Sequence, residues 1–280
     1  MKKRITILML ITILLSIGIG DVYAYPLSIN EEESLQLPEY SVWDFLKIAL
    51  EPVGSTLYIW GGGWNEEDTA AGVEAVSIGV SPLWQVYFDR QNQFYNYELT
   101  RYQIHDGLDC SGYVGWTVYN LLHRVDGGAG YVMNARKMAK NFSERGWGQY
   151  TPAHAVRDYL PGDIMSSKTH VYIVLGSCSD GSILVVHASP PGVQINGTVS
   201  RSGSSNSEAV RLANRYMKFF YPKWYQRYGT RVLDSNFLHN YSQMRWHVEG
   251  HSLMTDKEGL RKQSAENVMK LLLGEPDSRY

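Results

Sequence analysis

Three residues of the sequence could together perform nucleophilic catalysis: Cys110, His170 and His187. A cysteine nucleophile needs a thiol with a lowered pKa, a base that takes its proton, and a group that orients the base. Cys110 stands where a helix is expected to begin, and unpaired amides there favour a thiolate and could bind an oxyanion. These residue types predict attack on an amide carbonyl, with one histidine as base and the other as its orienting group.

The two histidines stand on segments that should pair as neighbouring strands. His170 opens the apolar run 170–176, and His187 lies near the end of the run 183–188. Residues 177–182 are rich in Ser, Asp and Gly, so the two runs predict an antiparallel hairpin. In such a hairpin both imidazoles approach one end of the sheet.

Each of these features also has an ordinary structural explanation. A cysteine at a helix start is more often an inert buried thiol, and a histidine at a strand end is usually an ordinary hydrogen-bonded side chain. Cys178 falls in the expected turn, and a disulfide to Cys110 would block catalysis, so we expect two free thiols. His247 and His251 are four residues apart, but Glu249 is at the wrong place for a zinc-protease helix. We therefore expect no metal site and no cofactor.

The remaining pattern predicts an α+β protein, because helices precede a group of antiparallel strands. Helical spacing of apolar residues is found over 41–49, 110–123, 134–142, 208–220 and 255–273. Further short strands are expected at 57–60, 164–165 and 241–248. Ser41 is the expected N-cap of the first helix.

Composition limits the class of protein. The chain has 280 residues, of which 44% are hydrophobic and 19% charged, which excludes a disordered or collagen-like chain. The net charge of −2 gives no indication of nucleic-acid binding. Two cysteines exclude a disulfide-stapled scaffold.

Residues 1–24 have the pattern of a secretory signal peptide. A basic start at 2–4 precedes an apolar run at 5–20, and Ala24 offers a small residue for cleavage. The alternative is a membrane anchor, but the run is shorter than the roughly 20 residues that span a bilayer. We therefore expect a secreted protein that works outside the cytoplasm, with a leader at 25–40 and no stable membrane insertion.

Five motifs occur in an order that resembles one enzyme family. They are Tyr58-Ile59-Trp60-Gly61-Gly62, Asp109-Cys110-Ser111-Gly112-Tyr113, Pro161-Gly162-Asp163-Ile164, His170-Val171 closing on Leu175-Gly176, and His187-Ala188-Ser189. In these motifs the chain resembles the NlpC/p60-like cell-wall cysteine peptidases over about residues 41–195, with 249 as an outer limit. The resemblance implies a papain-like core, in which the nucleophile begins a helix that packs on an antiparallel sheet.

The resemblance also implies an activity and a set of roles. Members of the family are thiol proteases, hydrolases that cleave peptidoglycan stem peptides, most often between D-glutamate and the diamino acid. The implied roles are nucleophile for Cys110, general base and acid for His170, third polar residue for His187, and substrate contacts for Tyr58, Asp109 and Ser111. The alternatives are strand packing for Tyr58 and an N-cap of the following helix for Asp109.

The chain departs from the family pattern in several places. Tyr172 stands where the family has a glycine, two residues after the base. Two long stretches, about 64–106 and 198–240, are expected to be insertions in a catalytic domain at 41–249. Long loops are often lids or binding loops, so they could wall the cleft or pack a local aromatic core. A C-terminal helical appendage is expected at 250–280.

Two other functions stay open at this point. One is a related amidase or acyltransferase acting on another acyl substrate. The other is a catalytically inactive wall-binding domain, against which the intact Cys110, His170 and His187 argue.

Overall fold

The computed structural model describes residues 40–64, 78–101, 103, 105–122 and 130–276. The chain divides into two units, residues 1–36 and 37–280, and all the described residues belong to the second. The expected signal peptide at 1–24 and all but the last residue of the expected leader at 25–40 lie outside the described residues.

A mostly antiparallel sheet forms the centre of the second unit, with the strand order β3-β2-β8-β7-β6-β5-β10-β4 and β9 beside β8. Its long strands β6 (Val171–Ser177), β7 (Ile183–Ser189) and β8 (Gly192–Thr198) follow one another and pair antiparallel. The shorter strands are β2 (Leu57–Tyr58), β3 (Gly107–Leu108), β4 (Gly148–Thr151), β5 (Ile164–Ser166), β9 (Val232–Leu233) and β10 (Ser242–Trp246). The expected α+β class and the expected hairpin of β6 with β7 are confirmed.

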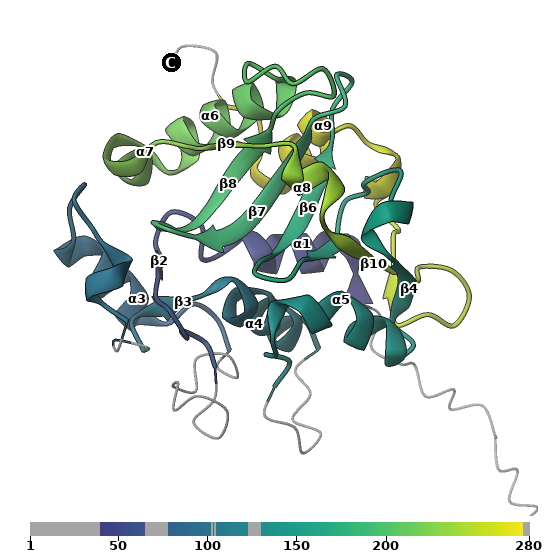
Figure 1. Cartoon of the computed structure of the whole chain (residues 1–280), viewed down its shortest axis with the longest axis horizontal. Helices are drawn as coiled ribbons and strands as arrows, with labels where there is room; N and C mark the ends of the chain where they lie inside the picture. Colours follow the sequence, from purple (N-terminus) through teal and green to yellow (C-terminus); the bar gives the residue numbers. More distant parts are fainter. Residues whose placement is uncertain (1–39, 65–77, 102, 104, 123–129, 277–280) are drawn as a thin grey trace, which may run out of the picture. The chain divides into compact units, whose positions relative to one another are not determined.

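One continuous core lies between these strands and the helices that pack on them (Figure 1). Helix α4 (Cys110–Leu122) is central, and all of its residues are buried, as is typical of a helix that is covered on every side. The other helices that contribute to this core include α1 (Val42–Leu50), α5 (Ala135–Glu144), α6 (Glu208–Phe220) and α9 (Ala265–Leu273). In the part of the chain that the structure describes, no helix has both the length and the apolar character needed to span a bilayer.

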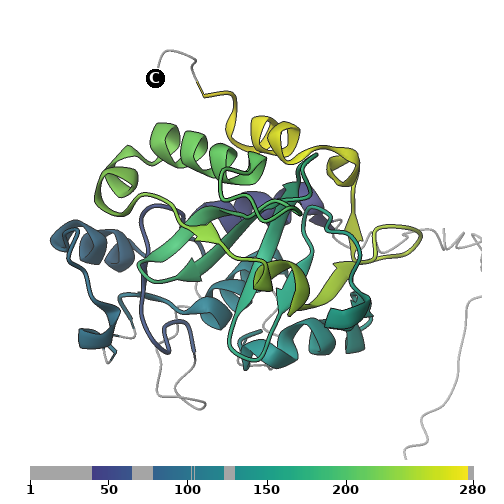
Figure 2. The same cartoon turned by 45° about the horizontal axis from the view of Figure 1, so that its top comes forward.

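The opposite face of β6 and β7 carries a second, smaller apolar cluster. Side chains alternate between the two faces of a strand, so Tyr172 and Val174 point away from the main core and join this cluster. The segment from β9 through α8 (Asn236–His239) covers it, with Leu233 and Phe237 packed against the strands. Figure 2 shows this segment in front of the sheet. Part of the expected insertion at 198–240 is therefore a cover for one face of the hairpin.

Two segments differ from the sequence expectation. Residues 64–106 showed no clear period, yet they contain α3 (Pro82–Arg90), which Ser81 caps and whose Trp84 packs edge-on against Trp116 at 5.8 Å. The helix expected at 255–273 begins only at Ala265, because strand β11 (Met254–Thr255) and a 3-10 turn at Leu260–Lys262 precede it.

Helix α9 packs closely on the sheet. A Cβ atom at Gly176, in the expected Leu-Gly motif, would lie 2.7 Å from the Cα of Ala265. That position therefore requires glycine, because any side chain would push the helix off the strand. Ala265, Val268, Met269 and Leu272 are buried in the main core. The C-terminal segment is thus an integrated part of the second unit in its helical portion.

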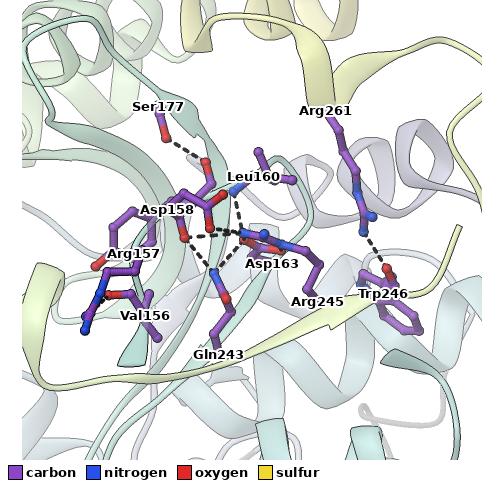
Figure 3. A network of polar contacts seen from close by, with 11 residues as sticks. Val156, Arg157, Asp158, Leu160, Asp163, Ser177, Gln243, Arg245, Trp246 and Arg261 are labelled. Carbon is purple, nitrogen blue, oxygen red and sulfur yellow. Dashed lines mark hydrogen bonds and ion pairs between the residues drawn. The ribbon is translucent and has the colours of Figure 1, made fainter. Parts of the chain in front are cut away.

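The aspartate of the Pro-Gly-Asp motif has a structural role (Figure 3). Asp163 is fully buried, and both of its carboxylate oxygens bind Arg245 of β10, at 3.0 and 2.8 Å. Gln243 and the amide of Leu160 donate to the same carboxylate, at 2.8 and 2.7 Å. A buried carboxylate requires such donors, and here they join the turn before β5 to β10.

Candidate active site

Cys110 is the first residue of α4, and the local backbone fixes its position. The amide of Asp109 donates to the carbonyl of Gly62 at 2.9 Å, next to the parallel pair of β2 and β3. A Cβ atom at Gly112 would lie 1.9 Å from that same carbonyl oxygen. The glycines on both sides of this contact therefore allow the helix start to approach β2 more closely than other residues could.

The thiol of Cys110 lies near backbone amides but is also buried. The amides of Val171, Ser111 and Cys110 itself act to lower the pKa of the thiol and so favour the thiolate. The side chain is only 6% exposed. Burial, followed by the nearby Asp109 carboxylate, dominates and raises the pKa of the Cys110 thiol to about 12. The expected lowering of the thiol pKa is thus wrong for this arrangement, because the loss of solvation outweighs the helix-start amides.

The expected histidine pair is present and in direct contact. His170 Nε2 and His187 Nδ1 lie 2.8 Å apart, and the two rings meet nearly edge-on, at 75°. His170 directly precedes β6, and His187 lies near the end of β7. Because the two strands pair antiparallel, both histidines lie at the same end of the hairpin. The second nitrogen of His187, Nε2, lies 2.9 Å from Nδ2 of Asn196 on β8. Each ring nitrogen of His187 therefore has a partner.

The environment of the pair favours neutral imidazoles. Burial lowers the pKa of His170 to about 4. The pKa of His187 is also lowered, first by burial and then by the positive charges of His170 and Arg231. At neutral pH both rings are uncharged in this arrangement.

The nucleophile and the pair meet at the same end of the sheet. One of the amides that act to lower the Cys110 pKa is that of Val171, the residue directly after His170. Tyr241 lies beside both groups: its ring packs on His170 at 6.4 Å, and the Cys110 charge adds to the burial that raises its pKa to about 12. Among the described residues, no hydrogen bond joins the Cys110 thiol to the His170 ring, whose Nδ1 is the nitrogen not engaged by His187.

An aromatic side chain of the segment from β9 through α8 packs against the pair, a contact that the sequence did not predict. Phe237 of α8 contacts both histidine rings, at 5.8 Å from His170 and 6.0 Å from His187. The Tyr172 hydroxyl donates to the carbonyl of Phe237 at 2.6 Å. The tyrosine that replaces the family glycine was the one sequence signal for this cover, because a large ring at that place needs a partner.

Tyr58 lies on β2 near the nucleophile. Burial raises its pKa, and the charges of Cys110 and Asp109 raise it further. Two tyrosines of the expected insertion at 64–106 hold it: Tyr95 donates to its carbonyl at 2.7 Å, and Tyr97 packs edge-on at 5.4 Å. Tyr58 thus has the strand packing that we gave as the alternative, while its contact with substrate stays a prediction.

Asp109 and Ser111 flank the nucleophile and are engaged within the chain. Asp109 Oδ1 accepts from the Gly112 amide at 2.6 Å and from the Ser111 hydroxyl at 2.9 Å, so Asp109 caps the helix as the alternative predicted. Trp64 Nε1 donates to Asp109 Oδ2 at 3.0 Å and to Ser111 Oγ at 3.1 Å, and no sequence pattern pointed to this residue. The expected contacts of Asp109 and Ser111 with substrate stay predictions.

Cys178 lies apart from the candidate site. Cys110 and Cys178 are both free thiols. Cys178 lines a cavity of about 480 Å³ together with Arg211 and Arg215, on residues separate from those of the candidate site. Within the described ranges, no group of three His, Cys, Asp or Glu side chains could hold a metal ion.

Comparison with known proteins found no match: no family model, no curated protein and no solved structure matches the chain. The functional interpretation therefore depends on the residues and geometry of the site itself.

Proposed function

We propose that this chain is a secreted cysteine endopeptidase of the cell wall with a papain-like core. Its substrates are peptidoglycan stem peptides, and the bond that it hydrolyses is the one between D-glutamate and the diamino acid. The observation that carries the proposal is the 2.8 Å contact of His170 with His187, beside a cysteine that begins a buried helix. The order of the five sequence motifs supports the choice of substrate.

In the proposed reaction, the Cys110 sulfur attacks the peptide carbonyl while its proton passes to His170. The amides at the start of α4 are available to bind the oxyanion, because the first amides of a helix have no intrahelical partner. The His170 imidazolium then protonates the leaving amine, and the amine departs as the thioester forms. Water attacks the thioester with His170 as base, which releases the carboxylic acid and restores the thiol.

The neutral resting states of Cys110 and His170 support a mechanism in which the thiol loses its proton only during the attack on the substrate. A buried neutral thiol beside a neutral imidazole requires proton transfer when substrate is bound, because burial opposes a preformed ion pair in the empty site. His187 has the place of the group that orients the base, as in other triads.

One observation favours a second candidate, an amidase or acyltransferase acting on another acyl substrate. The Asp109 carboxylate already accepts from Gly112, Ser111 and Trp64. A peptide substrate that offers a free amino group to Asp109 would compete with these donors, of which the Trp64 indole is the one outside the helix start. A substrate without that amino group would meet no such competition.

Mass spectrometry of purified muropeptides tests the proposal. The protein is incubated with muropeptides of defined stem length, beside the Cys110→Ala variant. Fragments that differ by cleavage after D-glutamate, formed only by the unsubstituted protein, are the expected result. Products with an intact stem peptide but a released glycan or a transferred acyl group would favour the second candidate. No product from the muropeptides would refute the proposed endopeptidase activity.

A further inference from the structure

The histidine pair is the end of a longer chain of hydrogen bonds that starts at a backbone amide. The amide of Arg231 lies 2.7 Å from Oδ1 of Asn196. Nδ2 of Asn196 lies 2.9 Å from Nε2 of His187, and Nδ1 of His187 lies 2.8 Å from Nε2 of His170. The inner members, Asn196 and His187, are almost fully buried.

The backbone amide gives this chain a direction. A peptide N–H can only donate, so the amide oxygen of Asn196 faces Arg231 and its NH₂ group faces His187. Nε2 of His187 must then accept, and a neutral imidazole with a bare Nε2 carries its proton on Nδ1. That proton is donated to His170 Nε2, which must therefore be bare. The neutral His170 ring therefore holds its own proton on Nδ1, the ring nitrogen that does not contact His187.

We propose that Asn196 is a positioning residue that holds His187 as its Nδ1–H tautomer and thereby prevents His170 from accepting the Cys110 proton in the resting enzyme. The inference rests on the proposed function, in which His170 is the base. An Nδ1 that already carries a proton cannot take a second one. The resting chain is therefore a hydrogen-bonded lock on the base.

Release of the lock requires the chain to reverse. His170 must give its Nδ1 proton to water and take the Nδ1 proton of His187 on its own Nε2, and His187 must take a proton from water on Nε2, so that the pair neither gains nor loses a proton. The bare Nδ1 of His170 can then accept the Cys110 proton, while His187 Nε2–H must donate to an oxygen. The Asn196 amide can offer that oxygen only by turning over, which breaks its bond to the Arg231 amide. Closing of the site around substrate would have to compensate for this one buried hydrogen bond.

The surroundings leave the pair without another source of charge stabilisation. The titratable or charged groups that face it are Cys110 from α4, Tyr241 before β10 and Arg231 before β9. In the described part of the chain, no carboxylate bonds to either ring. The lowered pKa values of both histidines agree with a neutral, locked pair.

Nitrogen-15 NMR of the imidazole side chains in the full-length protein reads the tautomers directly. At pH 7 we expect His187 and His170 each to carry one proton, on Nδ1 in both rings. Single-residue assignment comes from His170→Gln and His187→Gln spectra. A proton on His187 Nε2 in the unsubstituted protein would overturn the inference, and this measurement needs no substrate.

The Asn196→Asp variant should reverse the chain without losing the backbone bond. A carboxylate accepts from the Arg231 amide and from His187 Nε2–H at the same time. We expect His187 to move its proton to Nε2, and His170 to be protonated on both nitrogens. The positive ring beside Cys110 should raise its alkylation rate by iodoacetamide at pH 7 at least about tenfold, since one pKa unit is a factor of ten in thiolate.

Asn214→Asp is the matched control, because the Asn214 side chain is likewise hydrogen-bonded within the fold, with Oδ1 accepting from Tyr225 and Thr230, but no histidine is among these partners. It should leave both the spectrum and the alkylation rate unchanged. An Asn196→Asp spectrum with the original tautomers would overturn the lock. The expected tautomers in a protein that cleaves no muropeptide would refute the proposed function but not the lock, and cleavage with the opposite tautomers would refute the lock alone.

Discussion

The Tyr172 hydroxyl donates to the carbonyl of Phe237 at 2.6 Å, and this bond ties α8 to β6 directly over the histidine pair. The Phe237 ring in turn contacts both imidazoles. This cover contributes to the burial of the pair, in which His187 is fully buried and His170 half-buried, and burial lowers the pKa of both histidines. The tyrosine in place of the family glycine therefore supports the site from the same side as His170, since both rings contact Phe237.

Removal of the Tyr172 hydroxyl should weaken the cover. In Tyr172→Phe the Phe237 carbonyl loses its donor, and we expect a loss of about 1 kcal/mol in the free energy of unfolding. Tyr172→Ala should cost about 3–5 kcal/mol, because it also leaves a cavity. Urea unfolding measures both. Tyr150→Phe, at a half-exposed site on β4, is the control, and an equal loss there would contradict the assigned role.

Loss of the buried ion pair between Asp163 and Arg245 should lower the free energy of unfolding far more than loss of the exposed pair between Asp158 and Arg245. Asp163→Asn leaves Arg245 without its buried partner, and we expect a loss of about 3–5 kcal/mol in unfolding free energy. Asp158 binds the same guanidinium at 3.0 Å, but its side chain is 66% exposed. Asp158→Asn should therefore cost less than about 1 kcal/mol. Similar losses in the two variants would contradict the buried role.

Reactivity of Cys110 should increase only at high pH. Its pKa is raised to about 12, chiefly by burial, so the thiolate needed for alkylation is scarce at neutral pH. We expect the rate of iodoacetamide labelling, followed on the Cys110 peptide by mass spectrometry, to rise throughout the range from pH 7 to 10. A plateau reached below pH 7 would show a preformed thiolate and contradict the neutral resting site.

Acid should destabilise the fold through the histidine pair. The folded pKa of His170 is lowered to about 4 from an ordinary 6.5, so the unfolded chain binds a proton that the folded chain does not between these values. The free energy of unfolding should therefore fall as the pH decreases from about 6.5 to 4, and flatten below.

Unfolding titrations of the unsubstituted protein and of His170→Gln measure this effect. The variant lacks one titrating group, so its stability should fall less steeply over the same range. His239→Gln, at an exposed position of α8, is the control. A slope in His170→Gln identical to that of the unsubstituted protein would show that His170 is not buried in its neutral form.

Features of the site that depend on residues close in sequence, such as helix caps and hairpins, could be predicted. Ser41 caps α1 through a reciprocal bond with Asp44, and Cys110 begins α4, as helix signals in the sequence indicated. The hairpin that joins His170 to His187 followed from two apolar runs and a polar turn. Each of these features involves residues that are close in sequence.

Features that depend on distant packing could not be predicted in the same way. Trp64 reaches Asp109 across 45 positions of the sequence, and Phe237 reaches Tyr172 across 65. The direction of the Cys110 pKa shift was missed for the same reason. It depends on how deeply the surrounding segments bury the thiol, and no helix-start pattern contains that information.

Capture of a covalent intermediate on Cys110 tests the central claim most directly. The protein is mixed with a stem-peptide substrate, quenched in acid within the first turnover, and weighed intact before peptide mapping. We expect an added mass equal to the acyl part of the substrate, located on the Cys110 peptide. The adduct should be absent in Cys110→Ala and slower to form in His170→Gln. Product formation without any adduct on Cys110, or in the Cys110→Ala variant, would contradict the account.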